Sequence, residues 1–358
     1  MSDIKIVNFE PTSQGEQTHI YVIENNTGAS VSLCDFGASV VSVKVPDKNG
    51  NLCDIVLGYD HIKGYESDGT YFGATVGRCC GRIAHGKFEL NERKYQLPVN
   101  NGNNHLHGGF KSFSRRLWTA VIFEEKKNSV MFSLESQDGD EGYPGNMKVS
   151  VRYTFDDENV LSINWSALCD KDTICNLTNH SYFNLNGHKS SDALSTHRLR
   201  INSGYFVPIN ANLIPTGEIS SVKSTPFDFT KERLIKNSLD KSNEQIKFAN
   251  GIDHMFVLNN TTGELVMAAE AEGIESGITL KCFTTQNGVH LYTANYVDVP
   301  DNMGKEGTAY KKNSAFCLET QGFPDAVNHN TFPTTILKAN ENYTQVTKYC
   351  FGIVNHSK

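Results

Sequence analysis

MKVSVRYTFDDENVLSINWSALC, residues 147–169, is the stretch that decides the fold of this chain. Large apolar side chains occupy every second position on both sides of the acidic segment Asp156–Asn159: Met147, Val149, Val151, Tyr153 and Phe155, then Leu161, Ile163, Trp165 and Ala167. Because successive side chains of a strand point to opposite faces, this pattern predicts two half-buried strands. The polar segment between them is typical of a hairpin connection. The stretch therefore predicts an antiparallel β-hairpin.

Short polar segments typical of turns recur along the chain. Residues 47–50 (DKNG) and 259–263 (NNTTG) are short polar connections of the kind that close hairpins. Helical periodicity is nearly absent, and the polar stretch 230–248 is expected to hold at most a short helix or turn. The chain is therefore predicted to be all-β, with many antiparallel strands.

The chain shows no short repeat, no low-complexity segment and no linker rich in Pro, Gly or Ser over its 358 residues. Propellers and solenoids need such a repeat. We therefore expect a single domain over residues 1–358, built as one large antiparallel β-sandwich.

Charge and cysteine content limit the partners and the compartment. The net charge is -7 and the sequence has no basic run, which argues against nucleic acid and anionic membranes. Residues 1–6 lack the features of an export leader, and no apolar stretch is long enough to span a bilayer. Nine cysteines without paired spacing indicate buried free thiols. We expect a cytoplasmic protein.

Glu319 is the first candidate catalytic residue. It ends an apolar run, Phe316–Leu318, just before a turn that contains Gly322 and Pro324. A carboxylate placed there can project from the rim of a sheet into a cleft, where partial desolvation raises its pKa toward the range of a general base. The alternative is a solvated residue at a strand end.

Residues 103–109 (NNHLHGG) bring two histidines, His105 and His107, onto one face of an extended segment. The spacing suits either a metal site or the wall of an organic-ligand pocket, although both can be satisfied loop histidines. The metal reading would want a nearby Glu, and none follows in residues 108–112. The diglycine would let backbone approach a ligand.

Three further segments carry polar groups. His180 lies among hydrogen-bonding residues in 176–185, Arg78 and Arg82 are flanked by glycines in 77–82, and Asp253 follows a Gly turn. Each has a plain structural alternative: a core histidine, a solvated arginine, a turn aspartate. The aromatic residues expected beside these groups are Phe110, Trp118, Tyr182 and Phe323. Aromatic rings mixed with polar groups suit a carbohydrate.

Taken together, these segments resemble the aldose 1-epimerase, or galactose mutarotase, family. The resemblance covers nearly the whole chain and follows family order through the segments 35–40, 45–50, 54–59, 77–82, 106–109, 138–145, 177–185, 251–254 and 318–326. It implies a galactose mutarotase-like supersandwich. It also implies an isomerase that interconverts the α and β anomers of free hexoses such as D-galactose and D-glucose, in support of galactose metabolism.

The resemblance assigns roles by position. Glu319 matches the base and His180 the acid, while Arg82, His107 and Asp253 match substrate-binding residues. Asn104, in the loop of His107, is added as a further substrate-binding residue; His105 lies outside the family pattern and inherits no role. No cofactor or metal is expected, the only expected partner is the small-molecule aldose, and family analogy indicates a monomer.

Two departures and three alternatives remain. The chain has Cys79-Cys80 where the family often has aliphatic residues, and His290 where the family often has Gln. The change to His290 leaves the preferred aldose open. A glycoside hydrolase would need a second carboxylate. A hexose-6-phosphate mutarotase would need clustered arginines. A non-catalytic carbohydrate-binding protein would need neither Glu319 nor His180.

Overall fold

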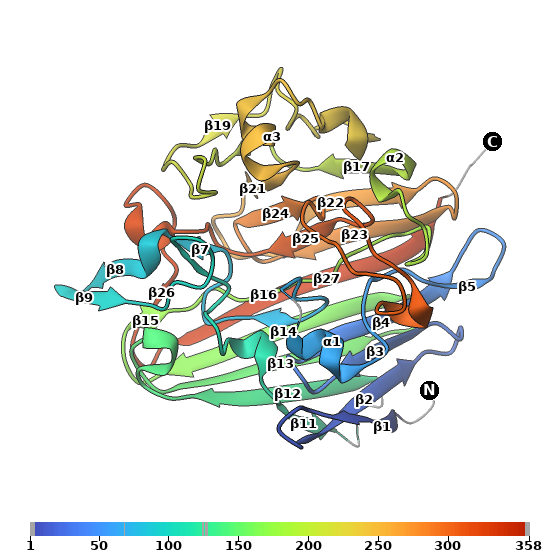
Figure 1. The fold of residues 1–358 in the computed structure, drawn as a ribbon, viewed down its shortest axis with the longest axis horizontal. Coiled ribbons are helices and arrows are strands. Elements are labelled where there is room, and N and C mark those ends of the chain that lie inside the picture. Colours follow the sequence, from blue (N-terminus) through green and yellow to red (C-terminus); the bar gives the residue numbers. More distant parts are fainter. Residues whose placement is uncertain (1–3, 68, 124, 126–127, 355–358) are drawn as a thin grey trace.

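The computed structural model describes residues 4–67, 69–123, 125 and 128–354, so residues 1–3, part of the segment inspected for a leader, lie outside it. Its largest element is a nine-stranded antiparallel sheet (Figure 1). The strands follow the order β11 (Thr119–Ile122), β12 (Ser129–Ser136), β13 (Met147–Phe155), β14 (Val160–Cys169), β27 (Asn342–Ile353), β23 (Ile278–Thr284), β22 (Val266–Gly273), β17 (His197–Ile201) and β20 (Arg233–Leu234).

The predicted hairpin forms the third and fourth strands of this sheet. Strands β13 and β14 pair from Met147 with Cys169 to Phe155 with Leu161, and the alternating apolar residues are the buried ones. The Asp156 carboxylate accepts hydrogen bonds from the backbone N–H groups of Glu158 and Val160 at 3.0 and 2.9 Å. The acidic connection thus closes the turn, as the sequence predicted.

Two five-stranded sheets complete the framework. One has the order β1 (Lys5–Pro11), β2 (Gln17–Glu24), β3 (Ser30–Cys34), β4 (Ser39–Pro46) and β5 (Leu52–Asp54). The other, here called the site sheet, has the order β19 (Ser220–Ser221), β18 (Tyr205–Phe206), β21 (Asp253–Val257), β24 (Gly288–Tyr292) and β25 (Cys317–Thr320). Two-stranded pairs fill the gaps: β6 (Thr75–Val76) with β16 (Thr178–Asn179), β7 (Arg82–Ile83) with β10 (His105–Leu106), β8 (Lys87–Leu90) with β9 (Arg93–Gln96), and β15 (Thr173–Ile174) with β26 (Ile336–Leu337).

One apolar cluster joins all three large sheets. It includes Val43 from the first five-stranded sheet, Val151 and Ile163 from the nine-stranded sheet, and Val289 and Leu318 from the site sheet. Burial of this shared surface is what holds the layers together. The predicted all-β antiparallel sandwich is confirmed.

Helices are short, as expected. The α-helices are α1 (Ile62–Ser67), α2 (Ala193–Thr196) and α3 (Glu244–Ala249), and the 3-10 turns are η1 (Ala84–Gly86), η2 (Phe113–Arg115), η3 (Asp140–Gly142), η4 (Ile235–Ser238), η5 (Lys305–Gly307) and η6 (Ala326–Asn328). The short helix anticipated in 230–248 is α3, capped by the Asn243 side chain. Among the residues described, no helix combines the length and apolar character needed to cross a membrane.

One turn assignment is wrong. Residues 47–50 do connect the paired strands β4 and β5. Residues 259–263, however, follow β21 of the site sheet and lead to β22 of the nine-stranded sheet, so they join two sheets. A polar turn signal reports a change of direction and does not say which strand the chain pairs with next.

Candidate active site

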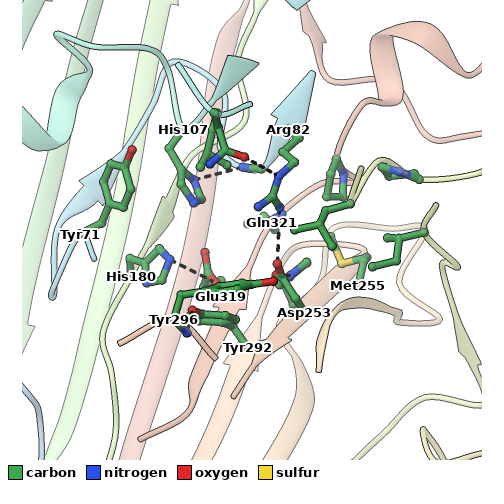
Figure 2. A pocket seen from close by; sticks show the side chains of 18 of the residues that line it. Tyr71, Arg82, His107, His180, Asp253, Met255, Tyr292, Tyr296, Glu319 and Gln321 are labelled. Carbon is green, nitrogen blue, oxygen red and sulfur yellow. Dashed lines mark hydrogen bonds and ion pairs between the residues drawn. The ribbon is translucent and has the colours of Figure 1, made fainter. Parts of the chain in front are cut away.

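The site is a cavity of about 310 Å³ over one face of the site sheet (Figure 2). Strand register explains why polar groups gather there. His290 pairs directly with Glu319 and with Met255 in the neighbouring strands, and Asp253 pairs with Tyr292. Directly paired residues and residues two apart along a strand share a face. The site sheet therefore presents these five side chains on one face, and all five line the cavity.

Glu319 lies near the end of β25, where all four residues are buried, and is itself 3 % exposed. Its Oε1 atom is 3.7 Å from Nε2 of His180. Burial raises the pKa of the Glu319 carboxyl well above its ordinary value, the Asp253 charge raises it further, and Arg82 opposes both. The solvated alternative for Glu319 is excluded by its burial.

His180 faces Glu319 from the segment after β16 (Figure 2). Its ring stacks on Tyr182 with centroids 4.9 Å apart, and Tyr71 lies 6.1 Å away on a nearly parallel plane. Burial lowers the pKa of His180 to about 4. Burial therefore disfavours the charged form of both residues. It favours a neutral pair, in which the Glu319 carboxyl holds its proton and the His180 ring is uncharged.

Asp253 is clamped by two donors. His290 Nε2 lies 2.7 Å from its Oδ1 atom, and Arg82 Nη1 lies 3.4 Å from its Oδ2 atom. Burial disfavours the carboxylate, but the hydrogen bond from His290 and the charge of Arg82 outweigh it and hold the pKa of Asp253 well below its usual range. Arg82 also donates through Nε to Asn101 Oδ1 at 3.1 Å. Asp253 is therefore a fixed negative charge in the cavity wall.

His107 closes the cavity opposite Glu319 (Figure 2). The backbone N–H of Gly81 donates to its Nδ1 atom at 3.3 Å, so the neutral ring carries its proton on Nε2. Burial and the neighbouring His180 lower the pKa of His107 well below its ordinary value. A Cβ on Gly108 would lie 1.9 Å from the carbonyl oxygen of Gly77. The diglycine thus permits a close backbone contact within the protein, which corrects the expectation of an approach to ligand.

Three residues from the same segments do not reach the cavity wall. Asn104 is buried, but its amide donates to the Asn212 carbonyl at 3.2 Å and its Oδ1 accepts from the His85 N–H at 3.0 Å. His105 bonds Pro98 O and the Tyr143 hydroxyl, both at 2.7 Å. Arg78 is 2 % exposed and donates to the Ser136 side chain and to backbone carbonyl oxygens. In place of Asn104, the nearby Asn101 lines the cavity.

The aromatic expectation is right for one residue in four. Tyr182 lines the cavity, whereas Phe110 is 59 % exposed and Trp118 is a core residue whose indole donates to Phe113 O. Phe323 belongs to a small separate cluster. The sequence reasoning missed the other aromatic lining residues, Tyr71, Tyr292 and Tyr296. Tyr292 had a signal, because it lies two residues beyond His290 on the same strand face.

Comparison with known families assigns the sequence to one of them. The sequence model of the family described as aldose 1-epimerase matches residues 19–350. The chain belongs to the aldose 1-epimerase family. Among curated members, the chain is 42% identical to the galactose mutarotase of Bos taurus over 323 residues, which cover 90% of this chain and 91% of that protein. It is 36% identical to the aldose 1-epimerase of Haemophilus influenzae over 340 residues, 94% of this chain and 96% of that protein.

Solved members of the family share the fold. An aldose epimerase homologue from C. elegans superposes with a TM-score of 0.86 at 34% identity, over 94% of this chain and 100% of that one. A galactose 1-epimerase from Lactobacillus acidophilus superposes with a TM-score of 0.84 at 26% identity, over 99% of both chains.

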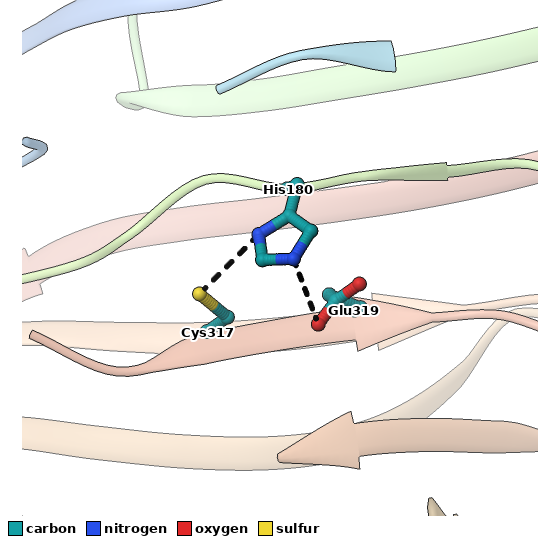
Figure 3. A group of neighbouring side chains, drawn as sticks. All are labelled: His180, Cys317 and Glu319. Atoms are coloured by element: carbon teal, nitrogen blue, oxygen red, sulfur yellow. Dashed lines mark hydrogen bonds and ion pairs between the residues drawn. The ribbon is translucent and has the colours of Figure 1, made fainter. Parts of the chain in front are cut away.

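One group in this family site has metal-ligand chemistry. His180, Cys317 and Glu319 each offer a donor atom, and these atoms lie within 4.8 Å of one another. The imidazole, however, directs Nδ1 at Cys317 and Nε2 at Glu319 (Figure 3). One ion cannot use both nitrogens, because they lie on opposite edges of the ring. The arrangement fits a chain of hydrogen-bonding groups better than donors converging on an ion.

Proposed function

We propose that this protein is an aldose 1-epimerase that interconverts the α and β anomers of free hexoses such as D-galactose and D-glucose, in support of galactose metabolism. The observation that carries the proposal is the buried His180–Glu319 pair, 3.7 Å apart, on the wall of a cavity of about 310 Å³. The reaction needs one base and one acid on either side of a sugar ring. It involves no redox step, so the proposal includes no cofactor.

The proposed reaction begins when the proton of the Glu319 carboxyl has moved to the imidazole of His180. Glu319 is then a carboxylate and His180 an imidazolium. Glu319 accepts the proton of the C1 hydroxyl while Nε2 of His180 donates a proton to the ring oxygen O5. The C1–O5 bond breaks and C1 becomes an aldehyde. Rotation about the C1–C2 bond and reversal of both transfers close the ring on the other face of C1. Atoms and protons balance over the cycle.

The remaining cavity residues orient the sugar in this proposal. Arg82 and Asp253 offer a hydrogen-bond donor and acceptor for hydroxyl groups, and their mutual pairing fixes both side chains. His107 donates from Nε2, because its Nδ1 accepts the Gly81 N–H. Tyrosine rings supply apolar surface for a sugar face. Such positioning supplies rate acceleration without further catalytic groups.

The decisive test is polarimetry of freshly dissolved α-D-galactose with wild type and Glu319→Gln. Because burial favours the uncharged carboxyl, an amide of nearly equal shape should leave the fold intact. We expect kcat to fall by about 10²–10⁴-fold, the usual contribution of a general base. Calorimetry should show galactose binding nearly unchanged. The exposed Glu341→Gln variant is the control and should behave as wild type.

Retained turnover in Glu319→Gln would remove Glu319 from the role of base. Failure of wild type to accelerate mutarotation of galactose, glucose and their 6-phosphates would leave a non-catalytic carbohydrate-binding protein as the better account. Release of sugar from a chromogenic galactoside would favour a glycoside hydrolase instead.

Free aldoses are favoured over hexose 6-phosphates by the distribution of arginines. Among the described residues that line the cavity, Arg82 is the one arginine, and it is paired with Asp253. Arg78 is enclosed by backbone carbonyls, and Arg116 pairs with Asp140. Binding of a dianionic phosphate would require cationic side chains that are not already paired with carboxylates.

We further propose a monomeric, cytoplasmic protein whose residues 1–358 form one domain. The cavity draws on residues from Gly69 to Pro324, and the largest apolar cluster on residues from Tyr21 to Phe351, which supports a single folding unit. All nine cysteines are free thiols, as a reducing compartment allows. Light scattering of the purified protein tests the monomer.

A further inference from the structure

Gln321 lines the cavity but has no part in the proposed reaction (Figure 2). It lies two residues beyond Glu319, and its backbone N–H donates to the Gly288 carbonyl at 3.1 Å, so it extends the pairing of β25 with β24 by one step. Residues two apart along a strand share a face. Gln321 therefore presents its side chain on the same face of the site sheet as Glu319.

The side-chain amide of Gln321 is buried, yet the protein does not use its full hydrogen-bonding capacity. The residue is 1 % exposed, and its Oε1 atom has no hydrogen-bond donor among the described residues. A buried amide oxygen normally has a partner, because leaving it unpaired costs free energy. Gln345 is equally buried and shows the usual case: its Nε2 donates to Thr320 O at 2.9 Å, and its Oε1 accepts from the Tyr343 hydroxyl. The amide of Gln321 is thus left for a ligand to complete.

The neighbours of Gln321 explain why the protein supplies no donor. Gly288, opposite Gln321 on β24, has no side chain, and a Cβ added there would lie 2.4 Å from Sδ of Met255. Met255 belongs to a small apolar cluster with Val207, and both residues line the cavity. Aliphatic carbons and a thioether donate no hydrogen bonds. A donor for the amide oxygen would therefore have to come from a molecule bound in the cavity.

We propose that Gln321 is a specificity-determining residue that hydrogen-bonds the 2-hydroxyl of the aldose. The order of groups along β25 leads to this hydroxyl. His180 lies over the stretch from Cys317 to Glu319, because its two ring nitrogens are 3.6 Å from Cys317 Sγ and 3.7 Å from Glu319 Oε1. Gln321 therefore lies on the far side of Glu319 from His180.

The sugar ring has the same order of atoms. In the proposed reaction His180 acts on O5 and Glu319 acts on the hydroxyl of C1. Within the ring, C1 is bonded to O5 on one side and to C2 on the other. A group on the far side of Glu319 from His180 therefore faces C2 and its hydroxyl. This inference rests on the proposed roles of His180 and Glu319.

A hydrogen bond at the 2-hydroxyl suits the reaction because C2 is the fixed end of the bond that rotates. After the ring opens, C1 turns about the C1–C2 bond to expose its other face. A contact at the 2-hydroxyl holds C2 in place during this rotation, so the aldehyde stays between the acid and the base. The amide can both donate and accept, so it can pair with a hydroxyl in either orientation. The ligand class is therefore aldoses with a free hydroxyl at C2.

The test is polarimetry of D-galactose and 2-deoxy-D-galactose with wild type and Gln321→Leu. We expect the variant to lower kcat/KM for D-galactose about five- to tenfold, the size of one neutral hydrogen bond. For 2-deoxy-D-galactose the change should be less than about twofold. Each sugar is compared between the two proteins, so the difference in intrinsic reactivity between the sugars cancels. The preference of the enzyme for the 2-hydroxyl should thus be lost in the variant.

Two controls separate a ligand contact from a structural role. The first is 6-deoxy-D-galactose, which keeps its 2-hydroxyl and should lose as much kcat/KM in Gln321→Leu as D-galactose does. The second is Gln345→Leu, which removes an amide that the protein does pair. It should lower Tm and keep the wild-type preference for the 2-hydroxyl. Gln321→Leu removes an unpaired buried oxygen, so its Tm should equal or exceed that of wild type.

Three results would overturn the proposal or part of it. An unchanged preference in Gln321→Leu, and in the smaller variant Gln321→Ala, would leave Gln321 without a role at the 2-hydroxyl. A loss of preference against 6-deoxy-D-galactose alone would place the amide at the other end of the sugar. If wild type accelerated no mutarotation, the proposed function would fail. Calorimetry of the same sugars with wild type and Gln321→Leu would then still decide whether the amide contacts the 2-hydroxyl.

Discussion

Two groups of ionisable side chains share the wall of one cavity and differ in their neighbours. Glu319 faces His180, and neither has a close charged partner that offsets its burial. Asp253 is somewhat less enclosed, and Arg82 and His290 both contact its carboxylate. Burial and the Asp253 charge therefore raise the pKa of Glu319, whereas the two partners of Asp253 outweigh its burial and lower its pKa.

In the proposed reaction, this contrast separates two tasks. A group that exchanges protons needs protonated and deprotonated states of similar free energy. His180 and Glu319, which lack a close compensating charge, provide them. A group that binds hydroxyls needs one state, which the clamped Asp253 provides. The same strand face carries both because the register of β21, β24 and β25 places them side by side.

The largest expected effect comes from the proton-transfer pair. His180→Gln should lower kcat by about 10²–10⁴-fold, because the amide cannot deliver a proton to O5. KM should change little, since Arg82 and Asp253 remain in place. Polarimetry over a range of galactose concentrations measures both. A variant with wild-type kcat would show that the acid is another group, with His107 as the next candidate.

His180 should also affect stability at low pH. Its folded-state pKa is about 4, below the ordinary value of 6.5, so between these values the unfolded chain binds more protons. Stability is therefore lost as pH falls through this window. His180→Gln removes that loss, on the order of 3 kcal/mol for this shift. Urea unfolding at pH 7 and pH 4 should show a smaller decrease for the variant than for wild type; an equal decrease would contradict the expectation.

Removal of the clamped carboxylate should act mainly on binding. Asp253→Asn leaves Arg82 without its charge partner and removes an acceptor for sugar hydroxyls, so we expect KM to rise about tenfold. The charge of Asp253 also raises the pKa of Glu319. The acid limb of the kcat profile should therefore move to lower pH in this variant. Movement to higher pH would show that the two groups are not electrostatically coupled in this way.

Local sequence reasoning predicted the strands better than the site. Alternation in 147–169 is a local signal, and both strands formed with the predicted faces. The partner of residues 259–263 depends on distant strands, and that assignment failed. Glu319 lies on β25 and His180 in the segment after β16, far apart in the chain, so their proximity came from the family resemblance and not from spacing.

The missed residues have physical explanations. Asn104 and Asn101 lie in one turn, where the Asn104 N–H donates to Asn101 O, and only the turn geometry decides which amide reaches the cavity. Cys317 was visible as a residue two before Glu319 on a strand. Its contact with His180 was not, because that contact depends on where the segment after β16 crosses the site sheet.

The smallest expected effect tests how Asp253 is clamped. His290→Gln restores the residue that the family often has, and its amide can still donate to Asp253 Oδ1, so KM should change less than about threefold at neutral pH. His290→Leu removes the donor, and the pKa of Asp253 should rise toward its ordinary value. Protonated Asp253 accepts a weaker hydrogen bond from a sugar hydroxyl than the carboxylate does. The rise of KM at acidic pH should therefore begin at higher pH in His290→Leu than in His290→Gln, as measured by polarimetry between pH 4 and 7. Identical profiles for the two variants would mean that Arg82 alone holds the charge, and the clamp would then consist of one cation and not two donors.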